Sequence, residues 1–174
     1  MYYRTRTYLA GDWDGDYDLI NQIQERNKSD NWALDFSDAH DLMQARDGSL
    51  PCTIKNSLSQ RLDASKTFVL IVGKHTNDVT KGSCQYCSNY PSRCSHNGYF
   101  DFRSFVKYEC EKAAREYKAG NMRIVVIYNS QYIYKDRCPE SLRFIGKHIP
   151  GLGTNAYGSS VLNYLEIKKA IMNL

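Results

Sequence analysis

The sequence predicts an α/β fold in which a central parallel sheet of about five strands is flanked by helices. Strand-like apolar runs alternate with amphipathic helical stretches along the 174 residues, and this alternation is typical of parallel sheets covered on both faces. One run, TFVLIV within Lys66 to Gly73, is continuously apolar, as expected for a strand buried on both sides. Because the length suits one core and no repeat or linker interrupts it, residues 1–174 are expected to form a single domain.

Each element of the N-terminal half is predicted from its periodicity and its ends. Strands show alternating or continuous apolar residues, whereas helices carry apolar residues three and four apart after a capping side chain. The motif GDWDGD, residues 11–16, forms a loop between the first strand and the first helix. The expected elements are a strand Tyr3 to Ala10, a helix from Asp16 or Asp18 to about Asn27, a strand Trp32 to Phe36, a helix capped by Thr53, and the strand Lys66 to Gly73.

The C-terminal half contains the best-defined helix and strand of the chain, between Ser104 and Asn129. A Gly-Asn pair at 120–121 ends this helix, and the run RIVVIY, Arg123 to Tyr128, forms the next strand. Further elements are expected over Pro139 to Lys147, as a helix, and from Ser159 or Ser160 to about Met172, as a final helix. The apolar stripe of the Ser104 helix consists of Val106, Cys110, Ala113, Ala114 and Tyr117.

A flavodoxin-like strand order, 2-1-3-4-5, fits this succession of elements. In that order the second strand lies on one side of the first strand, and the third strand lies on the other side. Ligands bind between the first and third strands, beyond the carboxyl ends of the strands. The GDWDGD loop and the connection from the third strand into the Ser104 helix would line this crevice.

Glu109 stands at the margin of the apolar stripe, about 80° from its middle on a regular helix. Two interpretations follow. A carboxylate held at such a margin, near the mouth of an α/β sheet, has the position of a reactive acid. Alternatively, Glu109 is a surface residue paired with Lys112, because the same helix offers other charge pairs at this spacing.

A cysteine-rich insertion, residues 82–100, separates the third strand from the Ser104 helix. Its spacing, Cys84-x2-Cys87-x6-Cys94-x-His96, offers four soft ligands for a structural tetrahedral Zn²⁺. The Cys-x-His half is tighter than usual zinc spacings, so a surface loop with free thiols remains the alternative. Redox chemistry is disfavoured for this CxxC because it does not open a helix after a strand.

Charge and hydropathy exclude several classes of function. The formal net charge of +4 comes from scattered Lys and Arg, so neither a nucleic-acid partner nor a zinc-dependent nucleic-acid binder is expected. The N-terminus lacks the apolar region of a signal peptide, and no apolar run is long enough to span a membrane. The expected location is therefore the cytoplasm, with no membrane partner.

Three stretches together resemble a known family. They are TYLAGDWDGD, IKNSLSQRLDASKTFVLIVGKHT and SFVKYECEKAAREYKAGNMRIVVI. Their order and spacing are similar to those of TIR domains, most of all the TIR-like proteins of Thoeris-type anti-phage defence. The resemblance covers about residue 4 to residue 130.

The resemblance implies a fold, a substrate and a reaction. It implies a flavodoxin-like TIR fold and an NAD⁺ glycohydrolase or ADP-ribosyl cyclase that cleaves the bond between nicotinamide and ribose. It also implies self-association into a homo-oligomer, a phage-derived activator, and a downstream effector reached by the ADP-ribose-derived product. The alternative is a non-catalytic module that binds a nucleotide or oligomerises.

The resemblance also assigns roles to residues. Glu109 takes the position of the family's catalytic glutamate, four residues after the aromatic Phe105, where the family more often has Trp. Phe36 and Asp38, at the end of the second strand, would meet the substrate. The residues Ala10, Gly11, Asp12 and Trp13 would form one wall of the NAD⁺ pocket, with Trp13 able to stack on a base.

Overall fold

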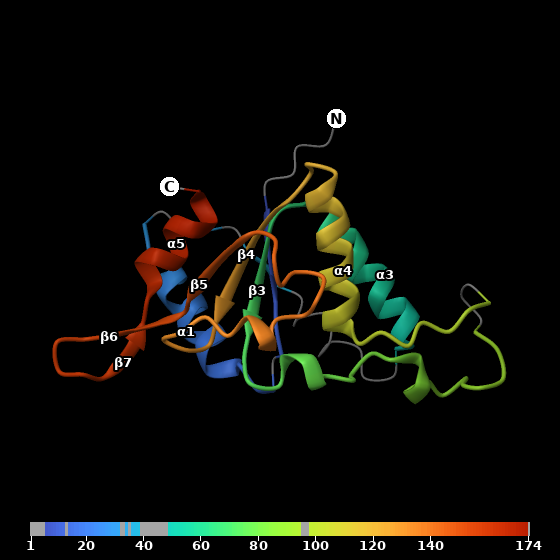
Figure 1. Cartoon of the computed structure of the whole chain (residues 1–174). Coiled ribbons are helices and arrows are strands. Elements are labelled where there is room, and N and C mark those ends of the chain that lie inside the picture. Colours follow the sequence, from blue (N-terminus) through green and yellow to red (C-terminus); the bar gives the residue numbers. More distant parts are fainter. Residues whose placement is uncertain are drawn as a thin grey trace.

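The computed structural model describes residues 6–12, 14–31, 34, 36–38, 49–94 and 98–173. Its centre is a five-stranded sheet in the order β2-β1-β3-β4-β5, in which every neighbouring pair is parallel (Figure 1). This confirms the predicted α/β class and strand order. The strands are β1 (Arg6–Ala10), β2 (Phe36–Asp38), β3 (Ser65–Val72), β4 (Arg123–Tyr128) and β5 (Lys147–Pro150).

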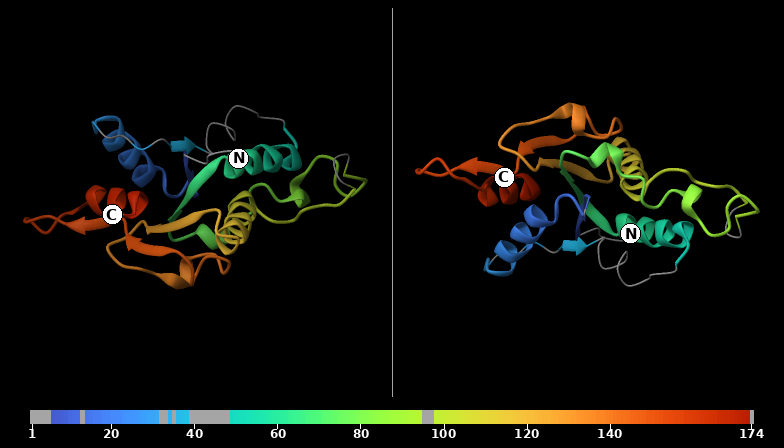
Figure 2. Two further views of the ribbon diagram at one scale, coloured as in Figure 1. Left: turned by 90° about the horizontal axis from the view of Figure 1, so that it is seen from above. Right: turned by 90° about the horizontal axis from the view of Figure 1, so that it is seen from below.

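Helices cover both faces of this sheet, and Figure 2 shows one pair on each side. The α-helices of the described residues are α1 (Tyr17–Lys28), α3 (Pro51–Asp63), α4 (Phe105–Lys118) and α5 (Tyr164–Met172). One apolar cluster joins α3 and α4 to the sheet, and a second joins α1 and α5 to its other face. Successive strand residues belong to opposite clusters, Tyr8 to the first and Leu9 to the second, because side chains alternate along a strand.

Local sequence explains the ends of α4 and β4, the elements predicted most closely. The side chain of Ser104 accepts a hydrogen bond from the backbone N–H of Lys107 and so caps the N-terminus of α4. Gly120 follows the helix with a φ of 75°, a conformation that glycine adopts without strain. The strand β4 has the predicted bounds.

The expected helix over Pro139 to Lys147 is wrong. The chain there forms turns and then enters β5, after the short 3-10 helix η3 (Lys135–Arg137). Gly146 has a φ of 80°, and a Cβ built on it would lie 2.6 Å from the carbonyl oxygen of Ile124. The chain therefore turns sharply against β4 instead of continuing a helix.

Other boundaries also differ from the prediction. The final helix begins at Tyr164, because Ser160–Leu162 forms β7 and pairs antiparallel with β6 (Leu152–Thr154). Helix α3 begins at Pro51, two residues before the expected cap Thr53. Pro is favoured at a first helical position because its missing N–H is not needed there. The second strand begins at Phe36, and Trp32 lies outside the described residues.

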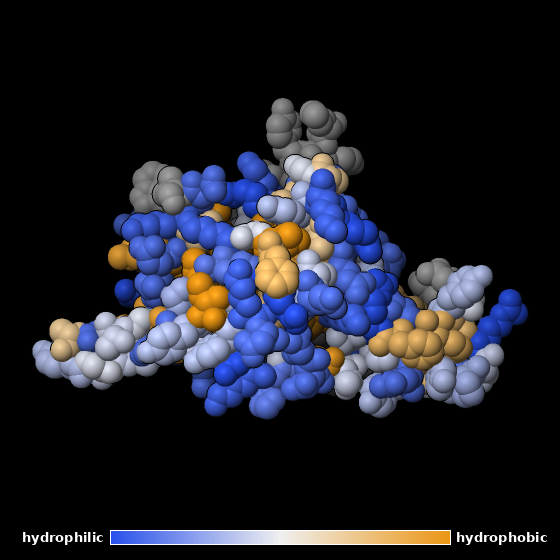
Figure 3. Space-filling model, in the orientation of Figure 1, coloured by the Kyte–Doolittle hydropathy of each residue, from blue (hydrophilic) through white to orange (hydrophobic). Residues whose placement is uncertain are grey.

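The cysteine-rich insertion projects from the body of the molecule at the end opposite the β6–β7 hairpin (Figures 1 and 2). It contains the 3-10 helix η2 (Cys84–Tyr86) and follows another, η1 (Thr76–Asp78). Apolar side chains gather on its outer face (Figure 3), where Tyr90 packs edge-on against Phe100 and Phe102. Among the described residues, no helix is long and apolar enough to cross a membrane.

Candidate functional site

The carboxyl ends of β1, β3 and β4 meet at one edge of the sheet around the buried side chain of Asp16. The amide of Asn129, the residue after β4, donates to Oδ1 of Asp16 at 2.7 Å. The backbone N–H of Gly73, the residue after β3, donates to the hydroxyl oxygen of Thr76 at 2.8 Å and lies close beside this carboxylate. Asp16 is 2% exposed, and burial raises the pKa of its carboxyl, against the effect of the Asn129 bond.

The sequence predicted Asp16 or Asp18 as a helix cap, and Asp16 does occupy the capping position of α1. Its side chain makes no capping hydrogen bond, however. The carboxylate points instead across the sheet edge, where a Cβ on Gly73 would lie 2.2 Å from Oδ1. An open cavity of about 270 Å³ lies beside it, lined by Asp12, Gly15, Asp16, Gly73, Lys74, His75 and Asn129.

Glu109 lies on the inner face of α4 and is 3% exposed. The phenol of Tyr8 in β1 donates a hydrogen bond to Oε1 of Glu109, and the Tyr8 ring stacks on Phe68 of β3 with centroids 5.7 Å apart. Burial raises the pKa of Glu109 to about 8, although the Tyr8 bond acts in the opposite direction. The Glu109 side chain is therefore mostly protonated and neutral at neutral pH.

The alternative interpretation of Glu109, as a surface residue paired with Lys112, is wrong. Lys112 forms a salt bridge with Asp63 of α3 at 2.8 Å and also donates to Ser59. Glu109 faces the sheet instead. A carboxyl group buried with so few polar neighbours is unusual in a protein core, and such groups are candidates for function.

Part of the predicted substrate wall comes together beside α4. Gly11, Asp12 and Phe105 line one small cavity of about 20 Å³, with Asp14, Val79, Lys81 and Val106. Such a volume holds about one water molecule. Glu109 lies one helical turn beyond Phe105 on the buried side of α4. Ala10 is fully buried in the same apolar cluster as Tyr8.

The small cavity is bordered by the chain that leads into the insertion, and we call residues 79–82 the cover. The backbone N–H of Phe105 donates to the carbonyl of Lys81 at 2.9 Å. Gly82 has a φ of 95°, and a Cβ there would lie 2.4 Å from the Phe105 ring. The cover therefore rests directly on the aromatic ring that precedes Glu109.

Of the other predicted substrate residues, Phe36 is placed elsewhere by the structure. Phe36 packs against the cluster of α1 and α5, on the face of the sheet opposite Glu109. Asp38 ends β2 opposite Leu9 of β1, and its side chain lies outside what the structure describes. Trp13 also lies outside the described residues.

The predicted zinc ligands are only partly described. Cys84 and Cys94 are buried and Cys87 is half-buried, whereas His96 lies outside the described residues. Within the described ranges, no group of three or more His, Cys, Asp or Glu side chains is placed to hold a metal ion. Zinc binding by Cys84, Cys87, Cys94 and His96 therefore stays a prediction.

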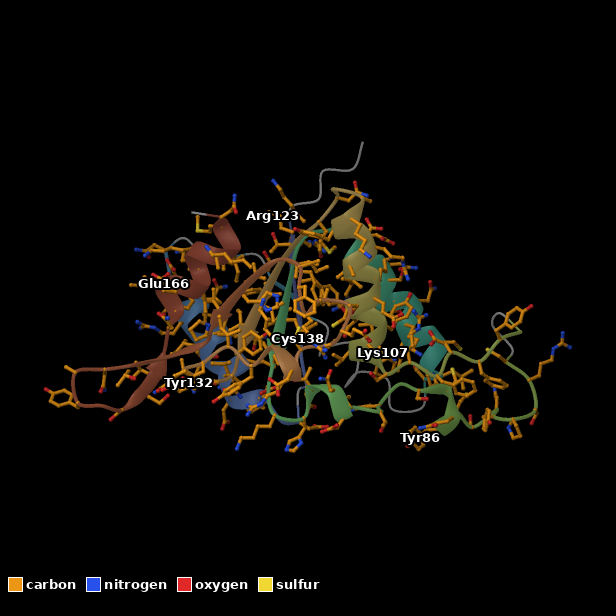
Figure 4. All side chains as sticks on the ribbon, viewed as in Figure 1. Tyr86, Lys107, Arg123, Tyr132, Cys138 and Glu166 are labelled. Carbon is orange, nitrogen blue, oxygen red and sulfur yellow. The ribbon has the colours of Figure 1, made fainter. Side chains whose placement is uncertain are left out.

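A larger cleft, of about 560 Å³, adjoins the small cavity and shares Val79 and Val106 with it. Lys107 and Arg143 contribute positive charge to its lining, and Glu111 and Glu140 contribute negative charge. Figure 4 shows Lys107 at the end of α4 nearest the insertion. The Nε of Arg143 is buried without a hydrogen-bond partner in the described part of the chain. The sequence did not indicate this cleft, because residues 139–143 were expected to form a helix.

Tyr8 is the other functional candidate that sequence reasoning missed. The alternation in TYLA places Tyr8 and Ala10 on one face of β1. That pattern does not say which helix packs on the face, so it could not pair Tyr8 with Glu109.

The chain was then compared with known proteins. Residues 8–81 match the family of the Thoeris protein ThsB, TIR-like domain. The resemblance found in the sequence is thereby confirmed, and the α/β architecture is consistent with a TIR-like fold. None of the curated proteins compared with the chain matches it.

The ThsB TIR-like match runs from Tyr8 in β1 to Lys81 in the cover. It includes the GDWDGD loop and ends before α4. The Thoeris relationship therefore rests on the N-terminal part of the sheet, while the role of Glu109 rests on the geometry around it.

Proposed function

We propose that this TIR-like protein cleaves the N-glycosidic bond between nicotinamide and ribose in NAD⁺ and releases or cyclises the ADP-ribose as a signal in anti-phage defence. The observation that carries the proposal is the buried Glu109, held by Tyr8 one turn beyond the cavity that Gly11, Asp12 and Phe105 line. The ThsB family match supports NAD⁺ as the substrate.

Glu109 suits this reaction because it can change charge when the substrate binds. Departure of nicotinamide leaves an oxocarbenium-like ribose, which a fixed carboxylate stabilises. Nicotinamide is already positively charged in NAD⁺ and leaves without being protonated, so one carboxyl group suffices. A bound cation lowers the pKa of Glu109 from its value of about 8 and ionises the group beside the reacting carbon.

Tyr8 supports the same step. Its O–H donates to Oε1 of Glu109, which stabilises the ionised form more than the neutral form. Because Tyr8 is fully buried and stacked on Phe68, it also fixes the direction in which the carboxylate points.

Catalysis requires the cover to move. The cavity of about 20 Å³ is far too small for a nicotinamide ring, whereas the adjoining cleft of about 560 Å³ has the size of a ligand pocket. Displacement of Val79 would join the two spaces. The cleft would then receive the ADP part of the substrate, with Lys107 and Arg143 near its diphosphate.

The proposal is tested by incubating the full-length protein with NAD⁺ and separating the products by chromatography. Wild type should release nicotinamide, and Glu109→Gln should lower the rate by about 10²- to 10³-fold, as expected for loss of one group that stabilises transition-state charge. Glu116→Gln, on the same helix outside the buried face, is the matched control and should keep the wild-type rate. An active Glu109→Gln variant would refute the assignment.

The small volume of the cavity beside Phe105 favours a second candidate, a non-catalytic module that binds a nucleotide or self-associates. In that case NAD⁺ binds wild type and Glu109→Gln equally, and no nicotinamide appears with either. Light scattering in the presence of NAD⁺ measures the expected homo-oligomer in the same samples. Adding lysate from phage-infected cells tests the need for an activator.

A further inference from the structure

Two cysteines from distant parts of the sequence meet beside the insertion. Cys52 lies in the first turn of α3, and Cys94 lies in the insertion. Burial raises the pKa of the Cys52 thiol, and the neighbouring Cys94 acts in the same direction. Both cysteines are reduced, and both line a cavity of about 580 Å³ on the side of α4 that faces α3.

The two cysteines lie beside a set of hydrogen bonds made by Lys55 of α3. The buried ammonium of Lys55, one turn along α3 from Cys52, donates to the carbonyl oxygens of Asp101 and Arg103 at 3.0 and 2.7 Å. It also lies 3.3 Å from the Asp101 carboxylate. The backbone N–H of Cys84 donates to Asp101 at 3.0 Å. Both ends of the insertion are thus tied together, and Lys55 holds them against α3 close to Cys52.

The two thiols differ in their accessibility. Cys52 is half-buried, whereas Cys94 is only 7% exposed. A reagent that enters the cavity therefore meets Cys52 first. Cys94 is then in place to attack Cys52 from within the protein.

We propose that Cys52 and Cys94 are a redox-sensitive pair that forms a reversible disulfide between α3 and the insertion. The oxidant is a small-molecule disulfide such as glutathione disulfide. The Cys52 thiolate attacks one sulfur of glutathione disulfide, forms a mixed disulfide and expels a glutathione thiolate. The Cys94 thiolate then attacks Cys52, forms the protein disulfide and expels the second glutathione. The two protons released by the cysteines end on the two glutathione thiols.

This pair uses Cys94, which also belongs to the predicted zinc set Cys84, Cys87, Cys94 and His96, so the disulfide and a zinc ion at that set exclude each other. Cys84 is buried beside Lys55, and Cys87 is half-buried at the end of the η2 turn. Disulfides in reducing compartments are usually transient and regulatory. A link between Cys52 and Cys94 would clamp the insertion to α3. Because the cover is continuous with the insertion, the link would also restrain the residues that rest on Phe105.

Peptide mapping tests the pair directly, because trypsin separates the cysteines. Cys52 falls in peptide 47–55, Cys94 in 94–103, and Cys84 with Cys87 in 82–93. The folded, full-length protein is treated with glutathione disulfide at about pH 8.5, where more thiol is ionised. Free thiols are then alkylated, and the digest is analysed by mass spectrometry.

The expected result is a linked peptide that joins 47–55 to 94–103 and disappears on reduction. Cys52→Ser and Cys94→Ser should each abolish it, and Cys87→Ser should leave it intact. The wild-type digest decides the question even if a serine variant fails to fold. A link within 82–93, or Cys52 recovered only as the alkylated or glutathione-bound form, overturns the proposal. The readout does not depend on NAD⁺ cleavage.

Discussion

Glu109 and Asp16 are buried to almost the same degree but lie in opposite kinds of surroundings. Their exposed fractions are 3% and 2%, and burial is the main reason that the pKa of each is raised. Asp16 receives a hydrogen bond from Asn129, lies close against Gly73 and borders an open cavity. Within the described part of the chain, Glu109 receives one hydrogen bond, from Tyr8, inside an apolar cluster.

The comparison separates a structural carboxylate from one available for chemistry. Asp16 connects the ends of β1, β3 and β4, so its bonds are used to hold the sheet edge together. Glu109 holds nothing comparable in place. A buried acid with few partners costs stability in its ionised form, and such a cost is expected where function requires the group.

The largest expected effect is on the pH dependence of stability in Glu109→Gln. The pKa of Glu109 is raised from 4.5 to about 8 on folding, so its neutral form favours the folded state fully below pH 4.5. As pH rises, the unfolded chain ionises first, and this contribution is lost by about pH 8. Gln has no proton to lose. The variant should therefore gain on the order of 3 kcal/mol over wild type by pH 7, measured by urea unfolding.

Asp16→Asn is the matched comparison. The Asn129 amide donates to Asp16 Oδ1, and Gly73 packs closely against the same carboxylate, so a substituted amide would present its N–H₂ group to the donor or to this close contact. We expect a loss of about 1–3 kcal/mol instead of a gain. If Asp16→Asn stabilises the protein as Glu109→Gln does, the distinction between the two carboxylates fails.

The next effect concerns the close approach at Gly73. A Cβ there would overlap the Asp16 carboxylate at 2.2 Å, so Gly73→Ala must push that side chain away from Asn129. The expected loss of stability is about 1–3 kcal/mol, measured by thermal or urea unfolding. Gly153→Ala, where a Cβ meets no atom within 4 Å, controls for the added methyl group. Equal melting temperatures for the two variants would contradict the account of Asp16.

The smallest expected effect is that of Tyr8→Phe. Removing the phenol O–H deletes the one hydrogen bond to Glu109 and should cost about 1 kcal/mol. Since that bond lowers the pKa of Glu109, its loss should also move the pH profile of nicotinamide release to higher pH. Tyr117→Phe, exposed on the same helix, should change neither quantity. A pH profile that stays in place would show that Tyr8 does not influence the ionisation of Glu109.

Apolar periodicity in the sequence was sufficient to predict an element correctly where that element is long and capping or turn residues mark its ends. The helix after Ser104 and the strand Arg123–Tyr128 have clear ends, and the structure has both elements there. Of the predicted apolar stripe of the helix, Tyr117 is exposed. The prediction from periodicity failed at residues 139–147. The spacing of Leu142 and Ile145 suggests a helix there, but Gly146 turns the chain into β5. A single left-handed glycine outweighed the apolar spacing.

The candidate site was also predictable only in part from the sequence. The position of Phe105 beside the GDWDGD loop followed from strand order, because the carboxyl ends of neighbouring parallel strands share an edge. The burial of Glu109 against Tyr8, the Asp16–Asn129 contact and the Cys52–Cys94 contact join residues far apart in the sequence. No periodicity within one element contains such information.

The contact between Gly82 and Phe105 affects how much space is left at the small cavity beside Phe105. A bare Cα rests on a phenyl ring with no space left for even one carbon atom between them. An indole at position 105, the more common side chain in the resembling family, would occupy the volume that the cover now fills. Under the proposed function, the bulk of the aromatic side chain at this position would set the width of the path to Glu109, and phenylalanine leaves room for the cover.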